Sequence, residues 1–218
     1  MIKAVFFDLD GVLIDSESMH QRYHEQFVKD TNCIVPAERF LRLIGGGRNI
    51  NIWELVAEGY DIDPDKLRDD LRAYKKHKVD AEDFGTLLFV EVPSVLDALH
   101  ANGYKVACAS SSPPEYISRA LAQCHITEKF DLIVSGNDFK LNKPEPDIYN
   151  YCLQHFGLSP DEAIVVEDST TGISAGKAAG IRVVARTDYK FGLDQRMADY
   201  KLDDLSSLVS LIKQVDGQ

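Results

Sequence analysis

Two carboxylates stand one residue apart near the start of the chain, where an apolar run ends in the segment DLDGVLIDS at residues 8–16. In extended backbone, residues i and i+2 point to the same side, so Asp8 and Asp10 can face one ligand together. Gly11 follows at once and lets the chain turn sharply. An acidic pair of this kind is often only a turn or a helix cap, so its chemistry depends on what other segments bring to it.

Other apolar runs deliver polar groups that complement the acidic pair. One run ends in Ser110, with Ser111 as a second hydroxyl, another leads into Glu167 and Asp168, and a later loop carries Lys143. A phosphoryl group needs an acceptor, a divalent cation that neutralises its oxygens, and hydrogen-bond and cationic contacts. The carboxylates offer the oxygen ligands that Mg²⁺ prefers, while the hydroxyls and the lysine can hold phosphoryl oxygens. The set predicts Mg²⁺-dependent phosphoryl chemistry on a small phosphorylated substrate.

Short apolar runs alternate with helical patterns on either side of residues 16–84. The runs with strand character are residues 2–7, 104–109, 130–134, 163–167 and 181–185. The helical patterns are residues 93–102, 113–124, 146–156, 172–179 and 204–215. This alternation predicts a doubly wound α/β domain, in which helices cover both faces of a parallel sheet. Ligands bind such sheets beyond the carboxyl ends of the strands, which is where the polar groups stand.

The segment 16–84 differs from the rest of the chain. Apolar side chains recur there at helical spacing, as at Met19 and Tyr23, and no convincing strand interrupts the pattern. We therefore predict a small helical domain inserted into the α/β domain, which is thereby divided into residues 1–15 and 85–218.

Composition narrows the class of protein. A net charge of −11 opposes binding to nucleic acid or to an anionic membrane surface. The four cysteines form no CxxC pair, so neither a zinc site nor a redox motif is expected, and a reducing compartment suits them. No apolar run approaches the roughly 20 residues of a membrane span, and no apolar leader precedes Asp8. These features predict a cytoplasmic protein whose oligomeric state is open and compatible with a monomer.

Four segments match, in order and spacing, the motifs of the haloacid dehalogenase superfamily, which the chain resembles over essentially its whole length. The segments are DLDGVLIDS at residues 8–16, the strand-terminal Ser110, Lys143-Pro144, and Glu167-Asp168-Ser169. The resemblance implies that Asp8 is the nucleophile that forms an aspartyl-phosphate and that Asp10 is the general acid and base. It also implies Mg²⁺ held by Asp8, by the backbone carbonyl of Asp10 and by Asp168, with Glu167 nearby. The helical insert resembles the small cap domain of this superfamily.

Three residues of the insert are candidate substrate contacts, because His20, Arg48 and Lys76 resemble cap residues of the β-phosphoglucomutase branch. A lone helical histidine is more often a packing residue, whereas His20 could also contact the substrate or Asp10. Arg48 follows glycines 45–47, which fit either a flexible helix break or a loop that presents the arginine to the substrate. Lys76 fits either a solvated helix face or a place in the cleft.

Three functions fit these observations. The first is a phosphatase for a small phosphorylated metabolite, above all a sugar phosphate, in which water resolves the aspartyl-phosphate. The second is a β-phosphoglucomutase-like isomerase, but Ile44 stands where that branch has a lysine. The third is a receiver-type signalling domain with a phosphorylated aspartate, which would lack both the insert and an acid/base such as Asp10. We predict the phosphatase.

Overall fold

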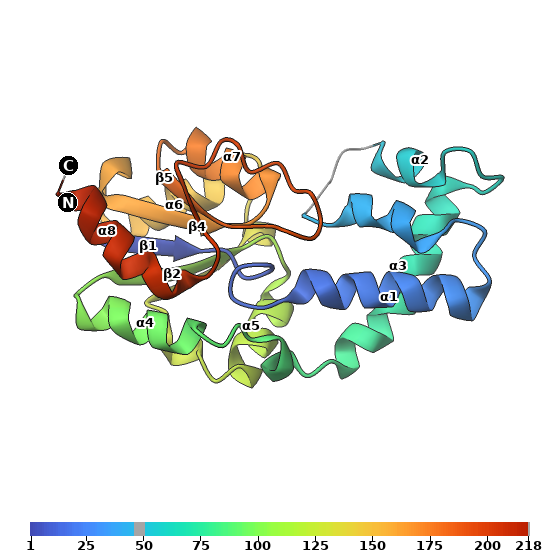
Figure 1. The fold of residues 1–218 in the computed structure, drawn as a ribbon, viewed down its shortest axis with the longest axis horizontal. Helices are drawn as coiled ribbons and strands as arrows, with labels where there is room; N and C mark the ends of the chain where they lie inside the picture. Colours follow the sequence, from blue (N-terminus) through green and yellow to red (C-terminus); the bar gives the residue numbers. More distant parts are fainter. Residues whose placement is uncertain (46–50, 218) are drawn as a thin grey trace. The chain divides into compact units, whose positions relative to one another are not determined.

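The computed structural model describes residues 1–45 and 51–217, and their contacts divide the chain into two compact units. The first unit, here called the core unit, comprises Met1–Asp15 and Phe84–Gln218. The second, here called the helical unit, is the continuous segment Ser16–Asp83. The chain therefore leaves the core unit after its first strand and returns to it at Phe84 (Figure 1).

The core unit contains one sheet of six strands, in which every neighbouring pair is parallel. The strands are β1 (Ala4–Phe7), β2 (Lys105–Ser110), β3 (Leu132–Ser135), β4 (Ala163–Glu167), β5 (Arg182–Arg186) and β6 (Tyr200–Leu202). Their order is β3-β2-β1-β4-β5-β6, so the direction of winding reverses at β1. The predicted fold class is confirmed, although the sequence reading missed β6, a short edge strand without a continuous apolar run.

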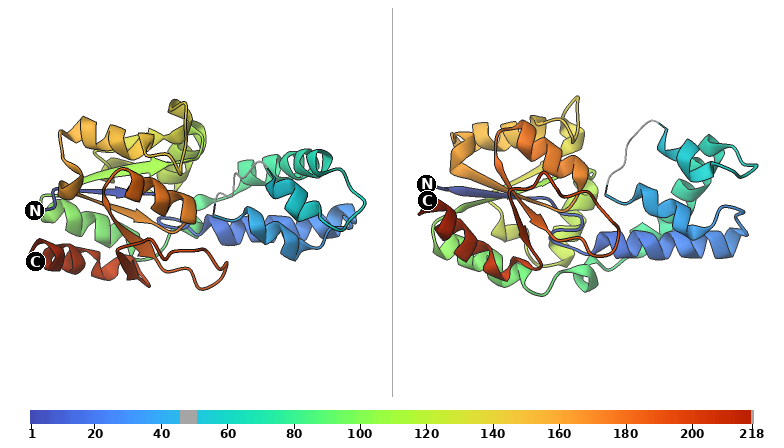
Figure 2. Two further views of the ribbon diagram at one scale, coloured as in Figure 1. Left: turned by 90° about the horizontal axis from the view of Figure 1, so that it is seen from above. Right: turned by 45° about the horizontal axis from the view of Figure 1, so that its top comes forward.

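Helices cover both faces of the sheet, as a parallel sheet requires. They are α4 (Val92–Ala101), α5 (Pro114–Gln123), α6 (Asp147–Phe156), α7 (Thr170–Ala178) and α8 (Leu208–Asp216). Helices α6 and α7 pack on one face, whereas α4 and α8 lie together on the other (Figure 2). All four residues of β1 are buried between these layers, which fixes the strand that leads into Asp8.

The helical unit contains α1 (Ser16–Thr31), a 3-10 helix (Ala37–Leu43), α2 (Ile52–Ala57) and α3 (Pro64–Ala81). Its described residues form no strand, because the apolar side chains follow the helical period and converge in one small core around Phe27, Phe40 and Leu67. Asp63 caps α3 by accepting hydrogen bonds from the backbone of the first turn. Arg48 and most of the predicted glycine break lie outside the described residues.

Candidate active site

The sheet register brings the chemical groups of three strands to one edge. Phe7 of β1 lies opposite Cys108 of β2 and Val166 of β4, so Asp8 directly follows β1 close to the ends of both neighbours. Ser110 is the last residue of β2 and Glu167 the last residue of β4. This edge is the point where the strand order reverses, which is the usual ligand position in doubly wound sheets.

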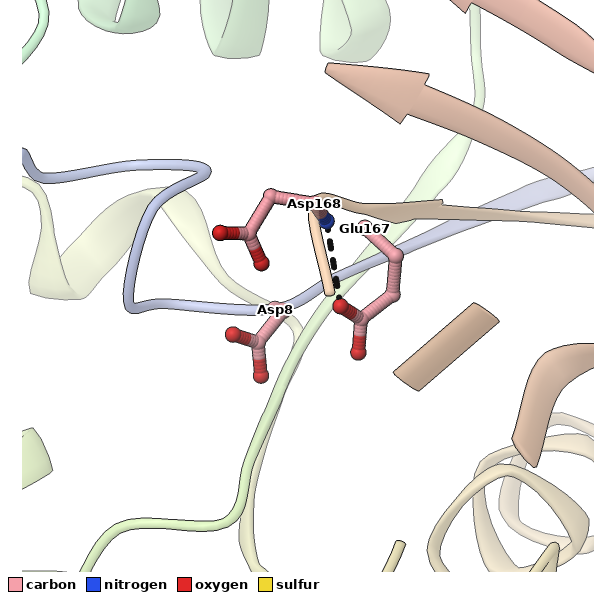
Figure 3. A group of neighbouring side chains, drawn as sticks. All are labelled: Asp8, Glu167 and Asp168. Carbon is pink, nitrogen blue, oxygen red and sulfur yellow. Dashed lines mark hydrogen bonds between the residues drawn. The ribbon is translucent and has the colours of Figure 1, made fainter. Parts of the chain in front are cut away.

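Three carboxylates meet at this edge. Asp8, Glu167 and Asp168 are buried, and each offers an oxygen within 4.8 Å of the others (Figure 3). The ammonium of Lys143 reaches them from the loop before α6, with Nζ lying 2.6 Å from Asp8 Oδ1 and 2.6 Å from Glu167 Oε1. It also donates to the carbonyl of Ala109 at 2.8 Å. The predicted acidic cluster and its lysine therefore form one buried group of charges.

Burial and the neighbouring charges shift the pKa values of Asp8 and Lys143. Burial raises the pKa of Asp8 to about 8, against the lowering effect of Lys143, and Glu167 and Asp10 raise it further. Burial lowers the pKa of Lys143, but Asp8 and Glu167 outweigh it and hold that pKa well above its usual value. A divalent cation beside Asp8 would favour its ionised form. The residues present thus fit a bound Mg²⁺ in charge and in donor type.

Both carboxylate oxygens of Glu167 accept hydrogen bonds from donors within the protein. Oε1 accepts from Lys143 and, at 2.8 Å, from the hydroxyl of Tyr149, while Oε2 accepts from the backbone N–H of Asp168 at 3.1 Å and from Ser169 Oγ at 3.2 Å. Gly172 lies so close that an added Cβ would overlap this carboxylate. Because its oxygens serve protein donors, Glu167 fits the task of holding Lys143 in place better than that of direct cation ligand.

The lack of a side chain at Gly11 leaves room for the Asp168 carboxylate. A Cβ at this position would collide with the Asp168 carboxylate, and the backbone has a φ of +74°, a conformation that favours glycine. The carbonyl of Asp168 accepts a hydrogen bond of 2.6 Å from the buried amide of Gln195, which also donates to the carbonyl of Arg186 at 2.7 Å. Gln195 therefore holds the backbone at Asp168, a contribution that no local sequence pattern indicates.

Asp10 is held by two hydroxyls that the sequence reading did not include in the site. Ser112 Oγ donates to Asp10 Oδ2 at 2.8 Å, and the hydroxyl of Tyr116 donates to Asp10 Oδ1 at 3.0 Å. Both donors belong to the segment that connects β2 to α5 and begins that helix. Its sequence, SSSPPEY, is typical of a helix entry, which explains why neither side chain was recognised.

The two predicted phosphate-binding serines differ in their surroundings. Ser110 is fully buried and its hydroxyl oxygen accepts from the backbone N–H of Ser112 at 3.1 Å. Ser111 Oγ donates to Asn142 Oδ1 at 2.8 Å, and that same oxygen accepts from the backbone N–H of Lys143 at 2.8 Å. Ser111 thus fastens the loop that carries Lys143. The contact of either serine with phosphate stays a prediction.

The other predicted residues belong to the helical unit or fall outside the description. His20 lies on α1, where burial, Lys75 and His24 hold its pKa well below the usual value. Its Nδ1 atom is buried without a hydrogen-bond partner. Lys76 is exposed on α3, and Arg48 lies outside the described residues. Their contact with a substrate stays a prediction.

Two further expectations can be compared with the structure. The four cysteines are free, and three of them, Cys108, Cys124 and Cys152, are buried. Over residues 1–45 and 51–217, no helix combines the length and the apolar character that crossing a membrane demands.

Residues 5–186 match the family model described as haloacid dehalogenase-like hydrolase. The chain belongs to this family, so the resemblance of its motifs is confirmed and the protein is a hydrolase. A protein from Aliivibrio fischeri named phosphoglycolate phosphatase is 28% identical over 210 residues, which cover 94% of this chain and 92% of the relative. A protein from Thermotoga maritima named phosphorylated carbohydrates phosphatase is 28% identical over 217 residues, which cover 97% and 94%.

Solved structures share the fold over nearly the whole chain. The crystal structure of CbbY from Rhodobacter sphaeroides in complex with phosphate has a TM-score of 0.71 at 25% identity, covering 95% of this chain and 96% of that one. A β-phosphoglucomutase from Clostridium difficile has a TM-score of 0.76 at 23% identity, covering 100% and 98%. The second likeness is one of fold alone.

Proposed function

We propose that the protein is a Mg²⁺-dependent phosphatase that hydrolyses a small phosphorylated metabolite, above all a sugar phosphate, through an aspartyl-phosphate on Asp8. One observation carries the proposal. The buried carboxylate of Asp8 lies at the point where the strand order reverses, against the Lys143 ammonium and beside Asp168. A nucleophilic carboxylate, a cationic contact and oxygen ligands for a divalent cation are thereby combined at one point.

The reaction then proceeds in two steps, formation of the aspartyl-phosphate and its hydrolysis. In the first, an oxygen of Asp8 bonds to phosphorus while the bond from phosphorus to the leaving oxygen breaks, and Asp10 gives that oxygen a proton. In the second, water attacks phosphorus, Asp10 takes the proton of the water, and the bond between Asp8 and phosphorus breaks. Inorganic phosphate leaves, and both carboxyl groups return to their starting states.

The remaining charged groups stabilise the transferred phosphoryl group. Lys143 would offset its negative charge, and the hydroxyls of Ser110 and Ser111 would bond its oxygens. Asp8, Asp168 and the carbonyl of Asp10 would hold Mg²⁺, which when bound screens the nucleophile from the phosphoryl oxygens. Glu167 would keep Lys143 in position, since that ammonium lies between it and Asp8.

Two observations support hydrolysis over isomerisation. Relatives that align over most of this chain carry phosphatase names, as in Aliivibrio fischeri and Thermotoga maritima. In the helical unit, Ile44 is buried and apolar at the position where the mutase branch has a lysine, so one cationic contact for a second phosphate is missing. A receiver-type signalling role is disfavoured by the inserted helical unit, which such domains lack.

Phosphate release from a panel of phosphorylated metabolites tests the proposal. We expect release only with Mg²⁺, and we expect Asp8→Asn to lose at least about 1,000-fold in kcat because it lacks the covalent step. Asp61→Asn, which changes an exposed aspartate of the helical unit, is the matched control and should act as wild type. Retention of a tenth of wild-type kcat by Asp8→Asn would falsify the assignment.

A second assay separates the isomerase. β-Glucose 1-phosphate with a bisphosphate primer should yield mostly free phosphate. Primer-dependent conversion to glucose 6-phosphate without phosphate release would favour the mutase instead.

A further inference from the structure

Both oxygens of the Asp10 carboxylate carry a hydroxyl donor. Tyr116 bonds Oδ1 at 3.0 Å and Ser112 bonds Oδ2 at 2.8 Å. The proposed function requires Asp10 to give a proton in one step and to take one in the next. The oxygen that exchanges the proton must present a lone pair to the substrate, and the oxygen whose hydroxyl donor moves more easily can do so at lower cost.

Tyr116 is held firmly in place. Its ring stands edge-on to Phe84, with ring centroids 4.9 Å apart and an interplanar angle of 78°. Phe84 is itself fully buried, its backbone N–H donates to Gln123 Oε1 at 2.9 Å, and the Arg119 guanidinium lies 4.8 Å from the centre of its ring. The Tyr116 hydroxyl oxygen sits at the end of a rigid ring, so this oxygen can move away from Asp10 only if the packed ring moves.

Ser112 combines a fixed backbone with a mobile hydroxyl. The backbone N–H donates to Ser110 Oγ at 3.1 Å, and the carbonyl accepts from Ser135 Oγ at 2.7 Å. Its hydroxyl can change between staggered positions by rotation about a single bond. Of the two donors, Ser112 can therefore release Asp10 at much lower cost.

We infer that Asp10 moves the proton through Oδ2, and that Tyr116 is a positioning residue that anchors Oδ1. The inference rests on the proposed function. In the first step the Ser112 hydroxyl yields its place, and the proton on Oδ2 passes to the leaving oxygen as the bond from that oxygen to phosphorus breaks. In the second step Oδ2 receives the proton of the attacking water. Oδ1 stays bonded to Tyr116 throughout, which keeps Oδ2 directed at the reacting oxygen.

Tyr116→Phe tests this role, since it removes the hydroxyl and keeps the ring on Phe84. With an alkyl phosphate we expect kcat to fall by about 10- to 100-fold while KM stays within about twofold, because Oδ2 is no longer directed at the reacting oxygen and substrate binding is unaffected. Ser112→Ala should lower kcat by less than about threefold. Tyr151→Phe, on the exposed side of α6, is the control for loss of a tyrosine hydroxyl. Thermal unfolding of each variant reports whether the fold is intact.

The rate of phosphoenzyme formation from a substrate whose leaving group departs without a proton distinguishes positioning of Asp10 from a structural role of Tyr116. For an aryl phosphate that the wild type hydrolyses, the first step needs no acid, so rapid-quench measurement should show Tyr116→Phe forming the phosphoenzyme within about twofold of the wild-type rate. Its breakdown, which needs Asp10 as base, should be slowed by the factor seen in kcat.

Three results would overturn the inference. The first is equal slowing of phosphoenzyme formation by Tyr116→Phe for alkyl and aryl phosphates. The second is a larger loss of kcat for Ser112→Ala than for Tyr116→Phe. The third is failure of wild-type enzyme to form any phosphoenzyme, which would refute the proposed function as well, whereas the first two leave that function standing.

Discussion

Replacing Lys143 by methionine removes the ammonium that lies between two buried carboxylates. Its Nζ is 2.6 Å from an oxygen of Asp8 and 2.6 Å from an oxygen of Glu167, and only 4% of its side chain is exposed. Removing one partner of a buried ion pair costs about 3–5 kcal/mol, since the other charge stays buried and unpaired. In a chain of this length each kcal/mol lowers Tm by about 2–4 °C, so we expect a loss of roughly 10 °C.

Thermal unfolding followed by circular dichroism measures this loss, with Lys140→Met as the control because that lysine is exposed three residues away. A Tm for Lys143→Met within about 2 °C of wild type, with wild-type phosphate release, would refute the argument that this lysine holds the charges of the site together.

Three further outcomes follow from the structure. Gly11→Ala should weaken Mg²⁺ binding by at least about tenfold in a calorimetric titration, since a Cβ displaces the Asp168 carboxylate, and wild-type affinity would contradict this account. Phosphate release should vanish with EDTA and return with Mg²⁺, and Asp168→Ala should raise the concentration required; metal-independent turnover would count against the cation site. Burial, aided by Lys75, lowers the pKa of His24 to about 3, so the unfolded chain binds the extra proton and the contribution of His24 to stability should fall as pH drops below 6.5, by up to about 1.4 kcal/mol per pH unit. His24→Gln should flatten that dependence in urea titrations at pH 7 and pH 5, and an unchanged slope would exclude His24 as its source.

The sequence was most informative where polar residues interrupt apolar runs. Each interruption marks a strand end, and parallel pairing brings strand ends to one edge, so the meeting of Asp8, Asp168 and Lys143 could be anticipated. The edge strand β6 could not, because only three residues form it and none is buried. Short edge strands depend on pairing with a neighbour and leave little pattern in the sequence.

The partners of Asp10 show a different limit. Ser112 and Tyr116 lie more than a hundred positions from Asp10 along the chain, and each has an ordinary local explanation as a helix entry or a helical residue. Two donors to Glu167 are equally invisible to local patterns, because Lys143 and Tyr149 lie 24 and 18 positions away along the chain. Long-range hydrogen bonds of this kind are set by tertiary packing, which periodicity does not report.

The position of β1 in the sheet has a consequence for synthesis of the protein. This strand is synthesised before the other five strands of the sheet, yet it pairs with Lys105 and its successors in β2 and with Ala163 and its successors in β4. A growing chain that ends before β4 therefore cannot place Asp8 beside Glu167 and Asp168, because both of these residues come at or after the end of that strand. The helical unit is one continuous segment with its own apolar cluster, so it can fold as soon as it emerges. The helical unit of the newly made protein can therefore fold before β1 has all of its partners in the sheet.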